Sequence, residues 1–220
     1  MFIGHFAAGF ALKRAAPRVS LGTLFLGAQF LDLLWPTLLL TGVEHVEIVP
    51  ETTSGPPLRF THYPFSHSLA WVAAWSAAFG ALHFARRRHL ASALVCAGAV
   101  LSHWFLDLIV HHPDLPLAPG DGPRVGFGLW GSLAGSLAVE LALFALGCWL
   151  YLRTTEARDR TGRFAFWGLV GFLLVIHLAN VFGQPPPSVA AVAWVGQAQW
   201  LLVLWAYWVD AHRRLRTSLS

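Results

Sequence analysis

The residues best suited to chemistry lie in segment 102–112, where three histidines and an aspartate interrupt an apolar run. His103, Asp107 and His111 are spaced four residues apart. Side chains at this spacing lie on one face of a helix, so two imidazoles and a carboxylate point the same way. Imidazole and carboxylate ligands together suit zinc, with manganese or iron as alternatives. The segment therefore predicts a metal site, and the alternative is a polar stripe that only faces the interior of a helical bundle.

A second polar motif, segment 60–68, lies at the start of another apolar run. Pro64 keeps His62 out of a regular helix, and Ser66 is a suitable N-cap for a helix that begins near His67. Histidines at such a junction suit ligand, acid–base or phosphate-contact roles, although they can also only snorkel to lipid head groups. There are four secondary candidates. His112 and Asp114 lie at and just beyond the end of segment 102–112, and Glu140 and His177 lie in two further apolar runs.

The composition indicates which elements must position these residues. Of the 220 residues, 56% are hydrophobic and 12% are charged, and the mean hydropathy is +0.57. So few charges cannot cover the surface of a soluble globule, and the composition is not that of a disordered, collagen-like or disulfide-framework chain. Cys96 and Cys148 lie in apolar runs, where reduced, buried thiols are expected.

Six apolar stretches are long enough to cross a bilayer, which takes about 20 helical residues. They span residues 19–41, 67–85, 90–110, 131–152, 164–182 and 189–209. The sequence predicts an all-α, integral membrane bundle of six transmembrane helices plus a short N-terminal half-helix over 1–12. We expect a single domain, 1–220, with a motif-bearing half, 1–115, and supporting helices over 131–209.

The basic residues predict the orientation of these helices. Thirteen of the 15 lysines and arginines fall in loops on one side of the predicted bundle. This asymmetry marks the cytoplasmic side, so both termini are expected there. The clustering of basic residues between apolar runs also argues against nucleic acid as a partner of this chain of net charge +4. A helix rises about 1.5 Å per residue. Counted from the basic residues at the cytoplasmic ends of the helices, most intramembrane polar groups lie in the outer half of the membrane. There they could converge on a cavity open to the periplasm.

The order of the motifs resembles a bacterial inner-membrane family described as membrane-bound metal-dependent hydrolases, one branch of which is LexA-regulated. The resemblance covers about the first half of the chain, and the family is grouped distantly with zinc-dependent phospholipase C. The residues that carry it are Gly4-His5, Asp32, His62, His67-Ser68, Ser102-His103 and Asp107. It implies five ligands, with Asp107 bridging: His5, Asp32, His67, His103 and Asp107. His111 or His112 would serve a further ion.

The chain departs from the family pattern at two places. Leu33 and Leu34 follow Asp32 where the family has an acidic pair, and Tyr63-Pro64 replaces an Arg-Gly. We expect one or two metal ions rather than a trinuclear cluster.

The leading hypothesis from the sequence is a multi-pass metal-dependent hydrolase of the bacterial inner membrane. Its substrate would be an amphipathic, lipid-like phosphoester from the periplasmic side, and its partners membrane lipids. His62 or His111 would protonate the leaving group. The oligomeric state stays open. Two alternatives are a transporter of ions or small solutes and a haem-binding electron carrier with His103 and His177 as axial ligands.

Overall fold

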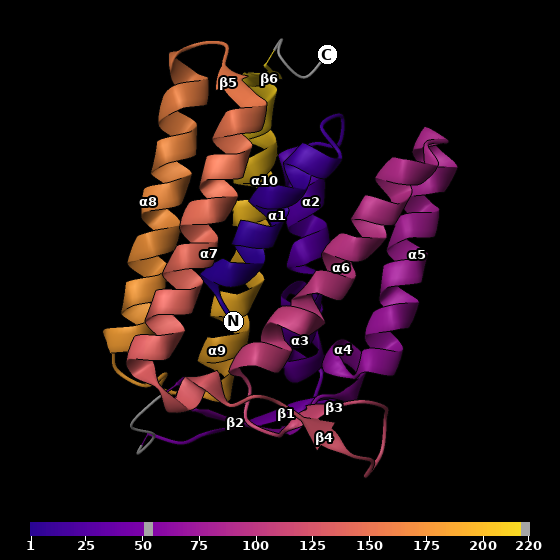
Figure 1. The fold of residues 1–220 in the computed structure, drawn as a ribbon. Helices are drawn as coiled ribbons and strands as arrows, with labels where there is room; N and C mark the ends of the chain where they lie inside the picture. The colour runs from indigo at the N-terminus through magenta and orange to yellow at the C-terminus, as the bar shows by residue number, and fades with distance from the viewer. Residues whose placement is uncertain (51–54, 217–220) are drawn as a thin grey trace.

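The protein, described by a computed structural model over residues 1–50 and 55–216, is mostly helical (Figure 1). The helices are α1 (Ile3–Ala15), α2 (Leu21–Ala28), α3 (Phe30–Leu40), α4 (Pro64–His67), α5 (Leu69–Arg87), α6 (Leu90–Val110), η1 (Leu129–Gly131), α7 (Leu133–Thr154), α8 (Arg160–Phe182), α9 (Val189–Gln197) and α10 (Gln199–Ala211). The strands are β1 (His45–Ile48), β2 (Leu58–His62), β3 (Leu115–Pro116), β4 (Arg124–Val125), β5 (Thr155–Ala157) and β6 (Arg213–Leu215).

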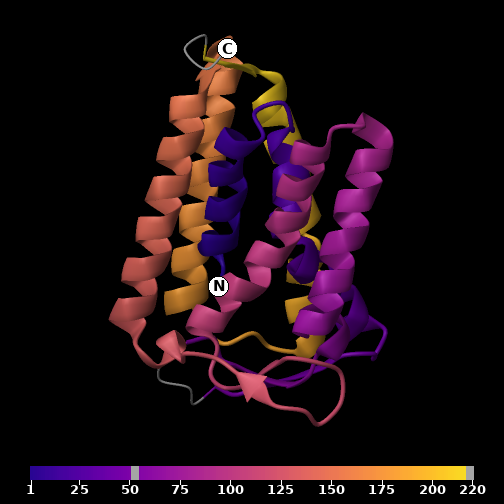
Figure 2. The same cartoon turned by 45° about the vertical axis from the view of Figure 1, so that its right-hand side comes forward.

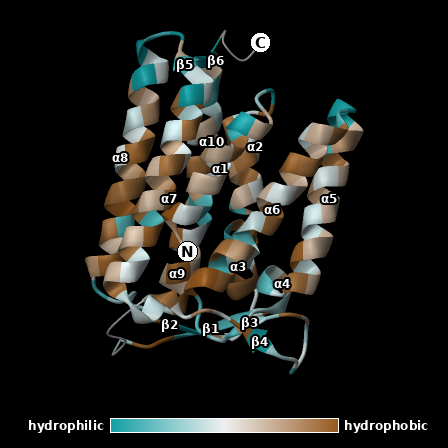
Figure 3. Ribbon diagram, in the orientation of Figure 1, coloured by the Kyte–Doolittle hydropathy of each residue, from teal (hydrophilic) through white to brown (hydrophobic). Residues whose placement is uncertain are grey.

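Four or five candidate membrane spans indicate a membrane protein. The helices α6, α7 and α8 and the continuous pair α9–α10 are each long and apolar enough to cross a bilayer, and the bent pair α2–α3 makes a fifth candidate. Along the bodies of these helices most residues are hydrophobic, and hydrophilic residues are more frequent toward the ends (Figure 3). The remaining predicted span, 67–85, corresponds to α5, which is not among the candidates. Six spans therefore stay a prediction.

The predicted span 19–41 is corrected in one respect, because its helix breaks at Gln29. The axes of α2 and α3 meet at 54°, and Gln29 caps the end of one helix and the start of the other. Pro36 lies inside α3 and has no N–H to donate to the carbonyl of Asp32. That carbonyl instead lies 3.5 Å from Nε2 of Gln199 in α10. Broken membrane helices persist where neighbouring side chains satisfy the freed backbone groups.

Two hydrophobic clusters form most of the core. One combines residues of α1, α2, α7, α8 and α10, and the other combines residues of α3, α5, α6 and α9 with the loops below them. Phe10 of α1 illustrates the first, because its ring contacts those of Phe25, Phe144, Tyr151 and Phe166. Helices α5 and α6 form a hairpin to one side of the remaining helices (Figure 2).

The two ends of the bundle differ. At one end lie the C-terminus, the α5–α6 turn and the short β5–β6 ladder (Figure 1). Three of the four basic clusters of the sequence lie in or beside these segments, at 86–88, 153–163 and 213–216. At the other end, the antiparallel pairs β1–β2 and β3–β4 form a cap over the helix ends (Figure 1). The sequence did not predict these short strands. The first residue lies at neither end, because Met1 is buried inside the bundle.

Candidate metal centre

Five polar side chains from four separate helices meet inside the bundle, toward its capped end. Together they form the candidate centre: His5 of α1, Asp32 of α3, His67 of α4, and His103 and Asp107 of α6. They include two overlapping groups of three that share His103 and could each hold a metal ion. Four of the side chains are buried, whereas that of Asp32 is 22% exposed. Asp32 is therefore the member most open to the surroundings.

The environment of His103 fixes which of its ring nitrogens carries the proton. Its Nδ1 lies 2.7 Å from the carbonyl oxygen of Ala28. A carbonyl can only accept, so Nδ1 donates, and in the neutral ring the lone pair is on Nε2. That Nε2 is buried and has no hydrogen-bond partner among the described residues; it lies 3.2 Å from Asp107 and 3.7 Å from Asp32. A buried lone pair that faces two carboxylates is stabilised by a cation between them.

His67 is oriented in the same way by a chain of hydrogen bonds. The hydroxyl of Ser66 donates to Glu44 at 2.6 Å, so its oxygen accepts from Nδ1 of His67, also at 2.6 Å. Glu44 is buried and accepts two further bonds from the backbone N–H groups of Phe65 and Ser66. The lone pair of neutral His67 therefore lies on Nε2, which faces Asp32 at 3.7 Å and Asp107 at 3.8 Å.

The size of the donor set suits a small divalent ion. The contacts between the imidazole nitrogens of His67 and His103 and the oxygens of Asp32 and Asp107 are 3.2 to 3.8 Å long. A tetrahedral zinc ion with ligands at about 2.0–2.1 Å needs ligand–ligand edges of about 3.3 Å. The residues present thus fit a bound metal ion in both donor type and spacing.

His5 is the fifth member of the cluster and is contributed by α1. Its ring stacks on that of His103, with centroids 3.5 Å apart, and its Nε2 lies 3.1 Å from Asp107, which also accepts from the amino group of Met1. Glu140 of α7 accepts hydrogen bonds from the backbone N–H groups of Phe2 and Gly4 at 2.8 and 3.3 Å. Glu140 thereby fixes the start of the helix that carries His5, and a negative charge there also suits the helix dipole.

A second histidine–aspartate pair lies one turn beyond Asp107. Nδ1 of His111 lies 2.9 Å from Asp114, and the hydroxyl of Tyr63 donates to the same carboxylate oxygen at 3.2 Å. The ring of Tyr63 also contacts that of His67, with centroids 5.4 Å apart. Burial lowers the pKa of His111, and the hydrogen bond with Asp114 opposes that shift in part. A neutral histidine oriented by a carboxylate is able to exchange protons near neutral pH.

The remaining predicted residues are not brought into the cluster. His62 is exposed on β2 beside His45, with ring centroids 6.0 Å apart. His112 is exposed. The ring of His177 stacks on Phe2, whereas that of His103 stacks on His5.

Sequence reasoning missed the residues that orient the ligands. Ser66 was expected to cap a helix, but Ser68 caps α5 by accepting from the backbone N–H of Trp71, and Ser66 orients His67 instead. Glu44 is 22 residues from Ser66 in the chain, and the acceptor for His103 is a backbone carbonyl. No local spacing could reveal either contact.

Comparisons of the chain with protein-family models, with curated proteins and with solved structures gave no match.

Proposed function

We propose that the protein is a membrane-embedded, metal-dependent hydrolase that acts on a phosphoester of an amphipathic, lipid-like molecule in the bacterial inner membrane. The observation that carries the proposal is the buried Nε2 of His103, which lies against two carboxylates and has no hydrogen-bond partner in the part of the chain that the structure describes. We propose zinc as the ion, because the ligands mix imidazole with carboxylate. The order of motifs resembles that of membrane-bound metal-dependent hydrolases, which supports the same assignment.

The residues take distinct roles in this proposal. His5, Asp32, His67, His103 and Asp107 hold the metal. When bound, such an ion polarises a phosphoryl oxygen and lowers the pKa of a coordinated water. Asp32 has the most exposed side chain of the five, so the substrate approaches on its side. His111, oriented by Asp114, takes up at Nε2 the proton that the attacking water releases and passes it to the leaving oxygen. In this proposal the end of the bundle nearer to Asp32 faces the periplasm, because the basic loops lie at the opposite end.

The test is a phosphodiesterase assay of the purified protein in detergent micelles, with a chromogenic phosphodiester and with a short-chain phospholipid as substrates. The proposal predicts hydrolysis that a chelator abolishes and added zinc restores. Asp32→Asn is expected to lower kcat at least about 100-fold, which corresponds to about 2.7 kcal/mol.

His45→Ala is the matched control, because His45 is an exposed histidine of the cap outside the cluster. It is expected to keep the wild-type rate. The proposal fails if the zinc-loaded protein hydrolyses neither substrate, or if Asp32→Asn hydrolyses both as fast as His45→Ala.

A further inference from the structure

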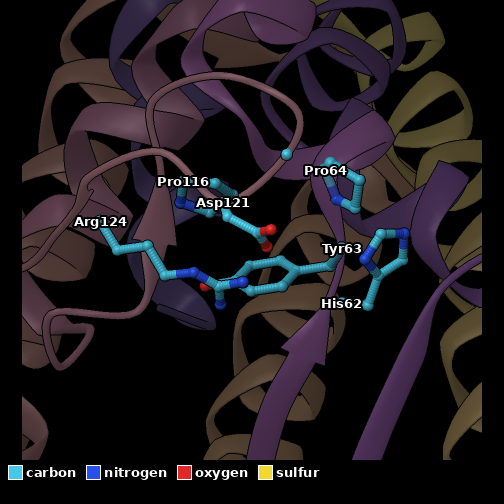
Figure 4. A pocket seen from close by; sticks show the side chains of 7 residues that line it. His62, Tyr63, Pro64, Pro116, Asp121 and Arg124 are labelled. Carbon is cyan, nitrogen blue, oxygen red and sulfur yellow. The ribbon is translucent and has the colours of Figure 1, made fainter.

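A second polar site lies in the cap, outside the metal centre. It is a small open pocket of about 60 Å³, large enough for several water molecules or for a polar group of that size. The side chains that line it come from the end of β2, the start of α4 and the β3–β4 hairpin (Figure 4). They are His62, Tyr63, Pro64, Pro116, Asp121 and Arg124, and Gly120 completes the wall.

The pocket holds two opposite charges that are not paired with each other. Arg124 and Asp121 both point toward Tyr63 (Figure 4), yet among the described residues neither takes part in an ion pair. The only hydrogen bond of the Arg124 side chain to a described residue is a 3.4 Å contact with the carbonyl of Asp114. Arg59, the other basic residue of the cap, is instead paired with Glu47. Arg124 and Asp121 therefore have free hydrogen-bonding capacity.

The opposite charges of Arg124 and Asp121 suit a zwitterionic ligand. A guanidinium group with several free N–H donors matches a phosphate, and an exposed imidazole, here that of His62, can donate to the same anion. The carboxylate of Asp121, three residues away in the chain, suits an ammonium group. A ligand that carries both a phosphate and a primary ammonium group would engage both ends of the pocket at once.

The position of the pocket identifies the source of such a ligand. The pocket lies where α4 and α5 begin, beside aromatic side chains that are typical of the membrane–water interface. The rings of Trp71 and Trp75 stack 5.5 Å apart, and the indole of Trp75 donates to the carbonyl of Phe65 at 2.9 Å. Phe65 follows the pocket residue Pro64 in the chain and is 36% exposed. A lipid with its head group in the pocket would place its chains beside this aromatic surface.

We propose that this pocket binds the head group of a zwitterionic, ethanolamine-type phospholipid of the outer leaflet, apart from the metal centre. The site is independent of hydrolysis, because its charged residues are not among those that hold the metal. It fixes the cap against the membrane surface.

Native mass spectrometry of the protein in micelles with equal amounts of phosphatidylethanolamine, phosphatidylglycerol and phosphatidic acid tests the proposal. We expect wild type to retain the ethanolamine lipid preferentially. Asp121→Asn should lower that preference at least about fivefold while still binding the other two lipids. Arg124→Gln should weaken all three, since it removes the phosphate contact. Arg59→Gln and Glu47→Gln, which alter the exposed pair of the same cap, should behave like wild type.

The same measurement on His103→Ala separates the two proposals. This variant is expected to lose metal but to keep the preference for the ethanolamine lipid. The lipid site is refuted if Asp121→Asn and Arg124→Gln retain the wild-type preference, or if soluble phosphoethanolamine displaces the lipid at equal concentration, which would assign the pocket to a free solute.

Discussion

At the residue scale, the candidate centre depends on groups that hold two imidazoles in one tautomer. Ala28 and Ser66 each accept from an Nδ1, so the Nε2 atoms of His103 and His67 face the carboxylates. Partners of this kind orient metal-binding histidines and raise the basicity of the free nitrogen. Ser66 and Glu44 are thus positioning residues, whose effect on a metal is transmitted through His67.

Removing the Ser66 hydroxyl should therefore weaken metal binding without removing a ligand. Ser66→Ala is expected to lower zinc affinity about 10- to 100-fold, the usual effect of losing such a partner. Ser66→Thr keeps the hydroxyl and should restore most of the affinity. Competition with a chromophoric chelator measures the zinc affinity of both variants. Ser76→Ala removes another buried hydroxyl, one that donates to Ala97, and should leave affinity unchanged; equal losses in Ser66→Ala and Ser76→Ala would contradict the role of Ser66.

His111 should make the stability of the protein depend on pH. Its pKa is lowered because burial disfavours the charged ring, so between its folded and unfolded pKa values the unfolded chain binds more protons. The contribution of neutral His111 to the free energy of unfolding is then fully present above about pH 6.5, and it is lost as the pH falls through the lowered pKa. Thermal unfolding midpoints measured from pH 7.5 to 5 should fall less steeply for His111→Gln than for wild type. Parallel curves would contradict this account.

At the element scale, the sequence predicts helices better than it predicts where they bend. Helix α6 has the predicted bounds. Helices α1, α7 and α8 each begin and end within a few residues of their own predicted bounds. The break at Gln29 was not predictable, because the run 19–41 is predominantly apolar on both sides of Gln29 and Asp32 is its only charged residue. The break depends on tertiary contacts, in which His103 and Gln199 bond backbone carbonyls on either side of it.

Close packing between α1 and α7 positions His5, and it depends on one glycine. A Cβ added at Gly147 would lie 2.5 Å from the carbonyl oxygen and 2.8 Å from the Cα of Ala7. Because those atoms are backbone, α1 itself must move. Gly147→Ala should destabilise the protein by about 1–3 kcal/mol and weaken metal binding.

Gly98 of α6 is the matched control for this substitution. A Cβ there would have no neighbour within 4 Å, so Gly98→Ala should be neutral or stabilise the helix by up to about 1 kcal/mol. Thermal unfolding and zinc titration compare the two variants. If Gly147→Ala matched Gly98→Ala in both measurements, the close α1–α7 contact would not be what positions His5.

At the scale of the whole molecule, the composition predicted a membrane protein and the order of the motifs predicted a metal site. The structure has four or five candidate spans and brings all five predicted ligands into one cluster. His62 shows the limit of this reasoning. It shares a motif with His67, but the chain turns at Pro64, which leaves His62 on the exposed strand while His67 enters the bundle.

The distribution of charge predicts which end of the bundle faces the cytoplasm. Single cysteines at Arg87 and at Glu47, in a background with Cys96→Ala and Cys148→Ala, would mark the two ends. With a membrane-impermeant maleimide, the Glu47→Cys protein should react in cells with a permeabilised outer membrane. The Arg87→Cys protein should react only after the inner membrane is broken. The reverse pattern would contradict the proposed orientation.

The most direct test of the central claim is elemental analysis of the protein purified without added metal or chelator. Wild type and the control His45→Ala are expected to carry at least about one zinc ion per chain. His103→Ala and Asp107→Asn, if they remain folded by circular dichroism, are expected to carry less than about a tenth of that, because each removes a buried ligand. Wild type without metal that also fails to take up zinc, or folded variants that keep the wild-type zinc content, would contradict the claim.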